Sequence, residues 1–187
     1  ALCDQQGLLL MFDEVQTGCG RTGEWFAYQH FDVAPDVMTL AKALCGGIAG
    51  GAMLASPEVA ASLRPGMHAA TFGGNPIASA AGIAALEMIE AEGLLEAGRE
   101  LGELFERRLK SLAEECPLVK EVRVLGAMIG LELAVEGAPA VKACQERKLL
   151  INCTQGNVIR LLPALNLTAE QAEEGCDILA EVVKEMA

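Results

Sequence analysis

The chain has 187 residues, of which 52% are hydrophobic, so it can bury a core in one domain or in one large and one small domain. It has no apolar run of about 18 residues that would span a membrane. Its net charge of -12 argues against nucleic acid or an anionic membrane as a partner, because either would need a basic surface.

Seven cysteines without a C-x-x-C pair predict free thiols in a reducing compartment, so we expect a cytoplasmic protein. Two histidines, His30 and His68, are far apart in the sequence, so we expect no metal site. The chain begins with Ala1 rather than Met and shows no signal peptide, and we expect it to be part of a longer protein.

Three strands are predicted in the first third of the chain. Gly7–Asp13 is a continuous apolar run ending in an acid, which is typical of a parallel strand covered on both faces, so we do not expect it at a sheet edge. Pro35–Lys42 and Gly51–Ser56 are the second and third predicted strands, joined by a glycine-rich turn.

Helices are predicted from start signals and apolar spacing. Ser56 and Pro57 open a short helix that reaches Leu63, and Asn75 with Pro76 opens a long one. The residues expected on one apolar face of the long helix are Ile77, Ala81, Ala84 and Met88. A further helix is predicted from the i, i+3, i+4 spacing of Leu101, Leu104, Phe105, Leu109 and Leu112.

The remainder predicts a small α+β unit. Its expected strands are 119–126, 128–135, 149–153 and 158–162, with a helix over 138–148 between the second and third. Thr168 and Gln171 form a capping box for a final helix. We place the domain boundary in the long connecting helices, giving residues 1–95 and 96–187, and we expect an α/β fold whose first domain holds a parallel sheet.

The stretch GCGRTG (Gly18–Gly23) fits the G-x-G-x-x-G pattern of dinucleotide-binding loops, which would indicate a nicotinamide-dependent dehydrogenase. Five residues separate it from the preceding apolar run, and clustered aromatic residues follow it rather than a helical stripe. We therefore give this interpretation little weight.

Asp13 and Lys42 follow two predicted strands, and the carboxyl ends of parallel strands are where open α/β sheets bind ligands. A lysine between Ala41 and Ala43 is unusual, although it is also compatible with an exposed lysine whose stem lies along the surface. A lysine and an aspartate beside glycine-rich backbone suggest pyridoxal phosphate. Its aldehyde forms a Schiff base with a lysine, and an acid keeps its ring nitrogen protonated.

These residues also carry a resemblance. The segment LLLMFDEVQTGCGRTGEWFAYQHFDVAPDVMTLAKALCGG resembles the signature of class III (ornithine-type) aminotransferases, which are fold-type I enzymes dependent on pyridoxal phosphate. HAATFGGNP (His68–Pro76) and GNVIRLLPAL (Gly156–Leu165) are further matches in the same order. The resemblance covers nearly the whole chain, and within the family it is to the acetylornithine branch.

The resemblance implies a role for five residues. Asp13 would pair with the pyridine nitrogen, and Gln16 would lie near the phenolic oxygen of the cofactor. Lys42 would be the Schiff-base lysine and would also move the proton at the substrate α-carbon. Thr71 would bind the cofactor phosphate of the neighbouring subunit, and Arg160 would hold the substrate α-carboxylate. Without the family, Arg160 reads as a surface arginine on a strand edge.

Two departures from the family pattern are Ala43 and Cys45, which stand where relatives often have glycine. Cys45 would be reactive if it were exposed. The phosphate loop and the aromatic residue that stacks on the cofactor, both found in the N-terminal half of family members, are not in this sequence. The chain therefore resembles the C-terminal half, so cofactor binding by this chain alone is in doubt, and we expect exposed apolar surface and self-association.

The resemblance implies an aminotransferase that moves an amino group between an N-acetylornithine-like amine and 2-oxoglutarate, with arginine biosynthesis as its setting and a homodimer with shared sites as its assembly. Ornithine or 4-aminobutyrate transamination is an alternative, and an aminomutase is a weaker one. A chain that only associates and has no activity is the alternative outside catalysis.

Overall fold

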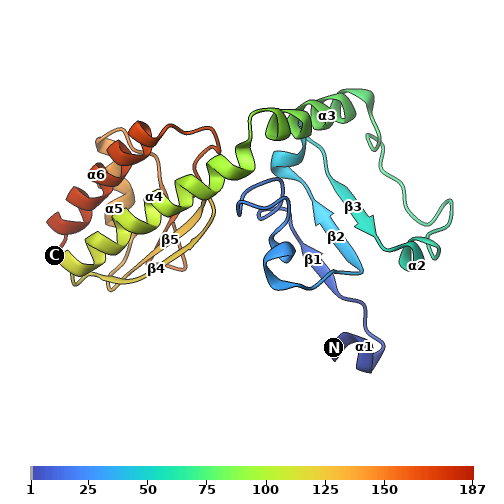
Figure 1. Ribbon diagram of the computed structural model, residues 1–187, viewed down its shortest axis with the longest axis horizontal. Helices are drawn as coiled ribbons and strands as arrows, with labels where there is room; N and C mark the ends of the chain where they lie inside the picture. Colours follow the sequence, from blue (N-terminus) through green and yellow to red (C-terminus); the bar gives the residue numbers. More distant parts are fainter. Residues whose placement is uncertain (1) are drawn as a thin grey trace. The chain divides into compact units, whose positions relative to one another are not determined.

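The computed structural model describes residues 2–187. The chain divides into two compact units, one ending at Leu94 and the other beginning at Leu95, and each contains its own sheet (Figure 1). None of the helices in the described residues is long and apolar enough to cross a membrane.

The sheet of the first unit has the order β1-β2-β3, formed by Met11–Asp13, Val37–Leu40 and Ala52–Ala55. Strand β1 runs parallel to β2, and β3 runs antiparallel to it. Val37, Met38 and Leu40 of β2 are buried, as expected for the central strand of the three. The three strands predicted from the sequence are therefore present, each shorter than predicted.

The environment of β1 differs from the prediction. The strand lies at the edge of the described sheet, and Met11 is 60% exposed, while Leu8 and Leu9 before it are exposed to a similar degree. The apolar run was correctly identified as a strand, but the prediction that it is covered on both faces is wrong for this chain. No strand or helix within residues 2–187 pairs with its outer edge. An apolar composition identifies a strand, but the neighbouring elements decide whether its faces and edge are covered.

Short helices and turns complete the first unit. They are α1 (Leu2–Gln6), η1 (Ala27–Phe31), η2 (Lys42–Cys45) and α2 (Pro57–Ala60). The Ser56 hydroxyl accepts a hydrogen bond from the Val59 N–H, so the predicted cap of α2 is confirmed. Helix α2 ends at Ala60, three residues before the predicted end at Leu63.

Helix α3 (Pro76–Ala91) begins as predicted, with the Asn75 side chain accepting a hydrogen bond of 2.9 Å from the Ala78 N–H. The predicted apolar face is wrong. Its buried residues are Gly82 and Ile89, whereas Ile77 is 70% and Met88 50% exposed. The helix is apolar around most of its circumference, so spacing alone does not select the face that packs against η2.

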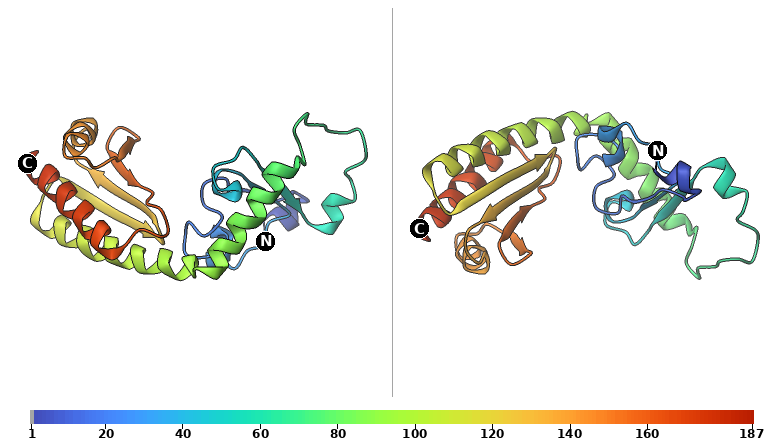
Figure 2. Two further views of the ribbon diagram at one scale, coloured as in Figure 1. Left: turned by 90° about the horizontal axis from the view of Figure 1, so that it is seen from above. Right: turned by 90° about the horizontal axis from the view of Figure 1, so that it is seen from below.

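The second unit contains three helices and a four-stranded antiparallel sheet. The helices are α4 (Leu94–Glu115), α5 (Ala138–Glu146) and α6 (Ala169–Glu185). The strands are β4 (Val119–Leu125), β5 (Met128–Leu133), β6 (Asn152–Thr154) and β7 (Val158–Leu161), in the order β4-β5-β7-β6. Figure 2 shows α4 and α6 side by side along the sheet, and α5 contacts α6 and β6.

One core joins these helices to the sheet. Leu101, Leu109 and the other three leucine and phenylalanine positions predicted to line α4 are all buried, which confirms that prediction. Ile129 and Ile159 face them from β5 and β7 and are almost fully buried. The capping box of α6 is also confirmed, because both of its hydrogen bonds, between Thr168 and Gln171, are 3.2 Å long.

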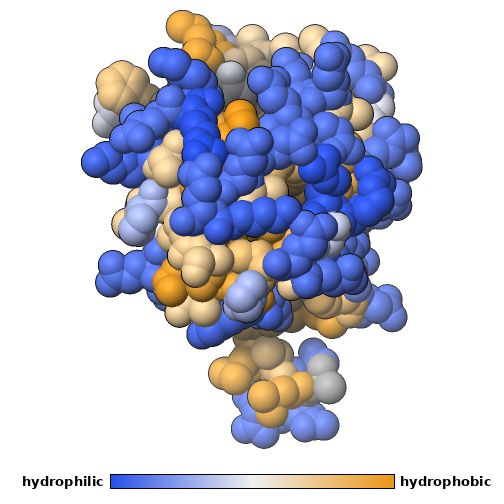
Figure 3. Space-filling view, turned by 90° about the vertical axis from the view of Figure 1, so that its left-hand side faces the viewer, coloured by the Kyte–Doolittle hydropathy of each residue, from blue (hydrophilic) through white to orange (hydrophobic). Residues whose placement is uncertain are grey.

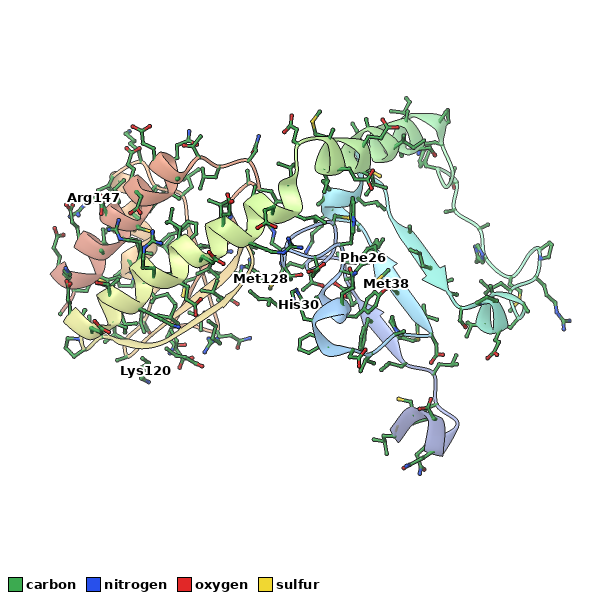
Figure 4. All side chains as sticks on the ribbon, in the orientation of Figure 1. Phe26, His30, Met38, Lys120, Met128 and Arg147 are labelled. Carbon is green, nitrogen blue, oxygen red and sulfur yellow. The ribbon has the colours of Figure 1, made fainter. Side chains whose placement is uncertain are left out.

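Ion pairs on the surface connect the helices. Arg108 of α4 pairs with Glu173 and Asp177 of α6. Arg147, labelled in Figure 4, lies beside α5 and pairs with Glu185 at 2.5 Å. Figure 3 shows a largely hydrophilic face with apolar atoms between the charged side chains. Ion pairs at the surface contribute little to stability, so the apolar core supplies most of it.

Glycine allows a close approach between α4 and the β4–β5 turn. A Cβ atom at Gly102 would lie 2.6 Å from the carbonyl oxygen of Gly126, and the backbone of this turn has little freedom to retreat. We expect Gly102→Ala to lower the free energy of unfolding by about 1–3 kcal/mol, measured by urea denaturation followed by circular dichroism.

Gly175→Ala in α6 is the matched control. A Cβ atom there would lie 3.6 Å from Leu149 Cδ1, which is ordinary contact, and alanine favours a helix over glycine by roughly 1 kcal/mol. This variant should be as stable as the parent or more stable. Equal behaviour of the two variants would contradict the packing role of Gly102.

Candidate functional site

Asp13 and Lys42 lie at one edge of the first sheet. Strands β1 and β2 are parallel, and their register pairs Asp13 with Thr39. Lys42 follows Thr39 by three residues, just after β2 ends at Leu40. The two side chains predicted to carry the chemistry therefore belong to the carboxyl ends of neighbouring strands, where open α/β sheets bind ligands.

The carboxylate of Asp13 is held on one side only. Its Oδ1 atom accepts hydrogen bonds from the Val15 N–H at 3.0 Å and from the Thr39 hydroxyl at 3.4 Å. Within residues 2–187 its Oδ2 atom has no hydrogen-bond partner, and the residue is exposed. The side chain is thus oriented by its neighbours and keeps one oxygen available for a cationic ligand group.

Lys42 begins η2 with a φ of 48°, in the left-handed region that few residues other than glycine adopt. It was predicted at the far end of a strand; β2 ends two residues earlier, at Leu40, and the chain turns sharply at Lys42. The side chain is exposed, and it pairs with no carboxylate in the described part of the chain. Backbone strain of this kind is concentrated at functional sites.

Glu14 organises the loop that follows Asp13, and sequence reasoning missed it. The side chain is 3% exposed and accepts hydrogen bonds from the Thr17 hydroxyl, the Ala27 N–H at 3.0 Å and the Tyr28 N–H at 2.9 Å. A buried carboxylate with several donors is stable while all of them remain. Glu14 therefore closes the loop that carries the half-buried Gln16.

The glycines of GCGRTG serve this loop. Gly20 and Gly23 have φ values of 89° and 83°, and a Cβ atom at Gly18 would lie 2.9 Å from the Glu14 carbonyl oxygen. The motif is followed by turns and then by the 3₁₀ helix η1, whereas a pyrophosphate-binding loop opens an α-helix. The geometry argues against the dinucleotide interpretation.

Thr71 lies in an exposed loop before α3, and its neighbour Phe72 is 82% exposed. Phe72 lines a hollow of about 340 Å³ together with Cys45 of η2 and residues of α3. Cys45 itself is only 6% exposed, with its sulfur next to Gly50 and Gly82. The condition for a reactive Cys45, exposure, is therefore not met.

Arg160 belongs to the second unit, on strand β7. This strand lies between β5 and β6, so the alternative of a strand-edge arginine is wrong. Its Nε atom donates to Asn152 Oδ1 at 3.2 Å, and the side chain is half-buried and lines hollows of about 440 and 320 Å³. It has no carboxylate partner among the residues described, whereas the other arginines of its unit form ion pairs: Arg99, Arg107, Arg108, Arg123 and Arg147.

Three kinds of comparison place this geometry among known proteins. The family model described as Aminotransferase class-III matches residues 1–183. Acetylornithine aminotransferase 1 of Bordetella pertussis is 48% identical over 184 residues, which are 98% of this chain and 47% of that protein. Acetylornithine aminotransferase of Methanocaldococcus jannaschii is 46% identical, over 99% of this chain and 46% of that protein.

Solved structures agree with the sequence comparison. Acetylornithine aminotransferase from Elizabethkingia anophelis has a TM-score of 0.92 at 37% identity, covering 98% of this chain and 47% of that one. An ornithine aminotransferase from Toxoplasma gondii, with partial occupancy of pyridoxal phosphate at its active site, has a TM-score of 0.93 at 32% identity and covers 99% and 45%.

The chain thus spans about half the length of the relatives it matches. Its fold is that of part of a fold-type I aminotransferase. The family match extends over both units and includes the edge with Asp13 and Lys42 as well as the strand with Arg160. This chain belongs to the class-III aminotransferase family.

Proposed function

We propose that this chain supplies the lysine, the aspartate and the carboxylate-binding arginine of a pyridoxal-phosphate-dependent aminotransferase. The substrates would be N-acetylornithine, or a related ω-amino compound, and 2-oxoglutarate. The observation that carries the proposal is the placement of Asp13 and Lys42 at one edge of two parallel strands. The names of the curated relatives support the choice of substrate.

The chemistry of the side chains at this edge fits the cofactor. Lys42 offers an amine without an ion-pair partner to the aldehyde, and Asp13 offers a carboxylate with one free oxygen to the pyridine nitrogen. The loop after Asp13 carries the amide of Gln16 for the phenolic oxygen. When bound, pyridoxal phosphate supplies an electron sink that stabilises negative charge at the substrate α-carbon. Lys42, Asp13 and Gln16 would hold it.

Lys42 would act twice in the reaction. Its Nζ atom would hold the cofactor in the resting protein, and as a free amine it would carry the proton at the substrate α-carbon. The turn at Lys42, with a φ of 48°, directs the chain away from β2 at this point. Asp13 would keep the pyridine nitrogen protonated through its free Oδ2 atom.

Arg160 would bind and orient the substrate through its α-carboxylate. Asn152 holds the Nε atom at 3.2 Å, which leaves the two terminal nitrogens to form a bidentate pair with a carboxylate. Fixing the carboxylate in this way would limit the rotation of the bound substrate.

A homodimer with shared sites would complete the cofactor site, with Thr71 of one copy binding the phosphate held by the other. The exposed position of Thr71, next to the exposed Phe72, supports this part of the proposal. The seven free cysteines support a reducing, cytoplasmic location. The names of the curated relatives support a role in amino-acid metabolism.

Ornithine is the second candidate substrate, because ornithine aminotransferases are among the structures with the same fold at 32–37% identity. The chain supplied with the N-terminal half of a close relative, pyridoxal phosphate and 2-oxoglutarate would distinguish these by its rate with N-acetylornithine, ornithine and 4-aminobutyrate. A chain that binds its own copies and turns over none of the three would instead be an associating chain without activity.

The role of Lys42 can be tested by reduction. Borohydride treatment of the chain with pyridoxal phosphate should leave a stable adduct on the peptide that contains Lys42, identified by mass spectrometry, because reduction fixes a cofactor attached to an amine. Lys42→Ala should lose the adduct, while Lys120→Ala should retain it. An adduct confined to another lysine would contradict the assignment.

Replacing Arg160 with lysine keeps the charge and removes the planar fork. We expect Arg160→Lys to weaken the binding of a carboxylate substrate by about 1.5–3 kcal/mol, the scale of hydrogen bonds to charged groups, measured as a change in Kd or KM. Cofactor absorbance should change little. A parallel loss of cofactor would show that Arg160 has a structural role instead.

Exposed apolar side chains predict association of the chain with itself. Leu8, Leu9, Met11, Phe72 and Ile77 are all more than half exposed, and exposed apolar surface of this extent marks interaction sites. Sedimentation velocity should show species larger than a monomer, and Phe72→Asp combined with Ile77→Asp should reduce them. Leu150→Asp, in the second unit, is the control. A monomer at all concentrations would contradict the expectation.

A further inference from the structure

Two arginines stand in one row on the face of the second sheet that lies opposite its core. The register pairs Gly130 of β5 with Arg123 of β4 on one side and with Arg160 of β7 on the other. Residues paired across strands project to the same face. Both arginines line the same hollow of about 320 Å³.

Gly130 leaves the middle of this row without a side chain. A Cβ atom at Gly130 would lie 3.8 Å from Arg123 Nε, so the Arg123 side chain lies over the glycine. The two guanidinium groups therefore share one open surface.

Glu132 can reach either arginine. It follows Gly130 by two residues on β5, so it is on the same face and diagonal to both Arg123 and Arg160. Diagonal neighbours are roughly 7–8 Å apart at the backbone, within reach of long side chains. In the structure Glu132 pairs with Arg123 at 2.9 Å. Glu121 pairs with the same Nη1 atom of Arg123.

Arg160 makes no such pair. Its contact is the hydrogen bond to Asn152, and within the described chain its terminal nitrogens have no carboxylate partner. By register both arginines are diagonal neighbours of Glu132, and it is Arg123 that holds the carboxylates.

We propose that Arg123 is a positioning residue for Arg160: it holds Glu132 and Glu121, and thereby keeps the Arg160 guanidinium free for the carboxylate of a substrate. The inference rests on the proposed role of Arg160. Without Arg123, Glu132 would have Arg160 as its diagonal cationic neighbour, and an internal carboxylate would compete with the substrate. The local charge would also become more negative and would repel an anionic ligand.

Two other groups act on Glu132. Lys120 and the Asn157 side chain, whose amide donates to the Leu133 carbonyl at 2.8 Å, each add to the lowering of the Glu132 pKa, which the hydrogen bond from Arg123 dominates. Figure 4 shows Lys120 extending outward from β4. A test must therefore separate Arg160 from these two.

The exchange of partners can be followed by the Glu132 carboxyl resonance in a pH titration of the 187-residue chain by NMR. In the parent chain the pKa of Glu132 is lowered by Arg123. In Arg123→Gln it should stay lowered, because Arg160 takes over the carboxylate. In the double variant Arg123→Gln with Arg160→Gln it should rise toward its ordinary value. Arg123→Lys keeps a cation in place and should match the parent.

Two results would overturn the proposal. A pKa of Glu132 that returns to its ordinary value in Arg123→Gln alone would show that Arg160 does not take the carboxylate. A pKa that stays equally low in the double variant would show that Lys120 and Asn157, rather than Arg160, account for it. Circular dichroism of each variant checks that the fold is retained.

The consequence for ligand binding is measured with 2-oxoglutarate as the probe, by isothermal titration calorimetry. Arg123→Gln should weaken binding about two- to fivefold, the ratio expected when an exposed ion pair must first be broken. Adding Glu132→Gln should restore it, which a purely structural defect would not allow. Arg107→Gln, which removes an arginine elsewhere on the same unit, should have no effect.

The two levels of inference fail separately. If Arg160→Gln binds 2-oxoglutarate as tightly as the parent, the proposed role of Arg160 is wrong, whatever happens at Arg123. If Arg160→Gln weakens binding but Arg123→Gln does not, or if Glu132→Gln fails to restore it, then Arg160 binds the ligand and Arg123 does not protect it.

Discussion

The parallel pairing of β1 with β2 is the constraint on which the proposed cofactor site depends. The two strands are only three and four residues long, so their register is held by contacts at both ends. At the start, the Leu10 N–H donates to Asp36 Oδ2 at 2.7 Å, and at the finish the Glu14 N–H donates to the Thr39 carbonyl at 3.0 Å. A slip of one residue would send Asp13 to the opposite face of the sheet and separate it from Lys42.

Glu14 extends this constraint to the loop beyond the strand. Its backbone N–H fixes the end of β1 against β2, and its buried carboxylate accepts bonds from Thr17, Ala27 and Tyr28. A single residue thus couples the position of Asp13 to the closure of the loop that carries Gln16. A buried carboxylate would be unfavourable without these donors, so the loop and the charge stabilise each other.

The sequence predicted those features that periodicity or local chemistry determines. Helix α4 carries apolar residues at helical spacing among charged ones, so its buried face could be predicted. Helix α3 is apolar on most sides, and contact with η2 selects the face that is buried. The residues at the strand ends were found because an acid and a lysine terminate apolar runs. Their roles came from resemblance and stay predictions. Glu14 was missed because its partners lie up to 14 residues away, and no local pattern marks it.

The register of the second sheet could not be predicted from the sequence, and it decides which side chains lie next to Arg160. Arg160 was singled out within a family motif, but the relation of Arg123 to it appears only when Gly130 is paired with both. Seen in the sequence, Arg123 is one of several charged residues in an exposed strand, and its ion pairs look like ordinary surface pairs. Within the sheet, the same pairs occupy two carboxylates on the face that carries the guanidinium proposed to bind an anion. Exposed ion pairs add little to stability. The proposed value of the pair between Arg123 and Glu132 is that it keeps the Glu132 carboxylate away from Arg160.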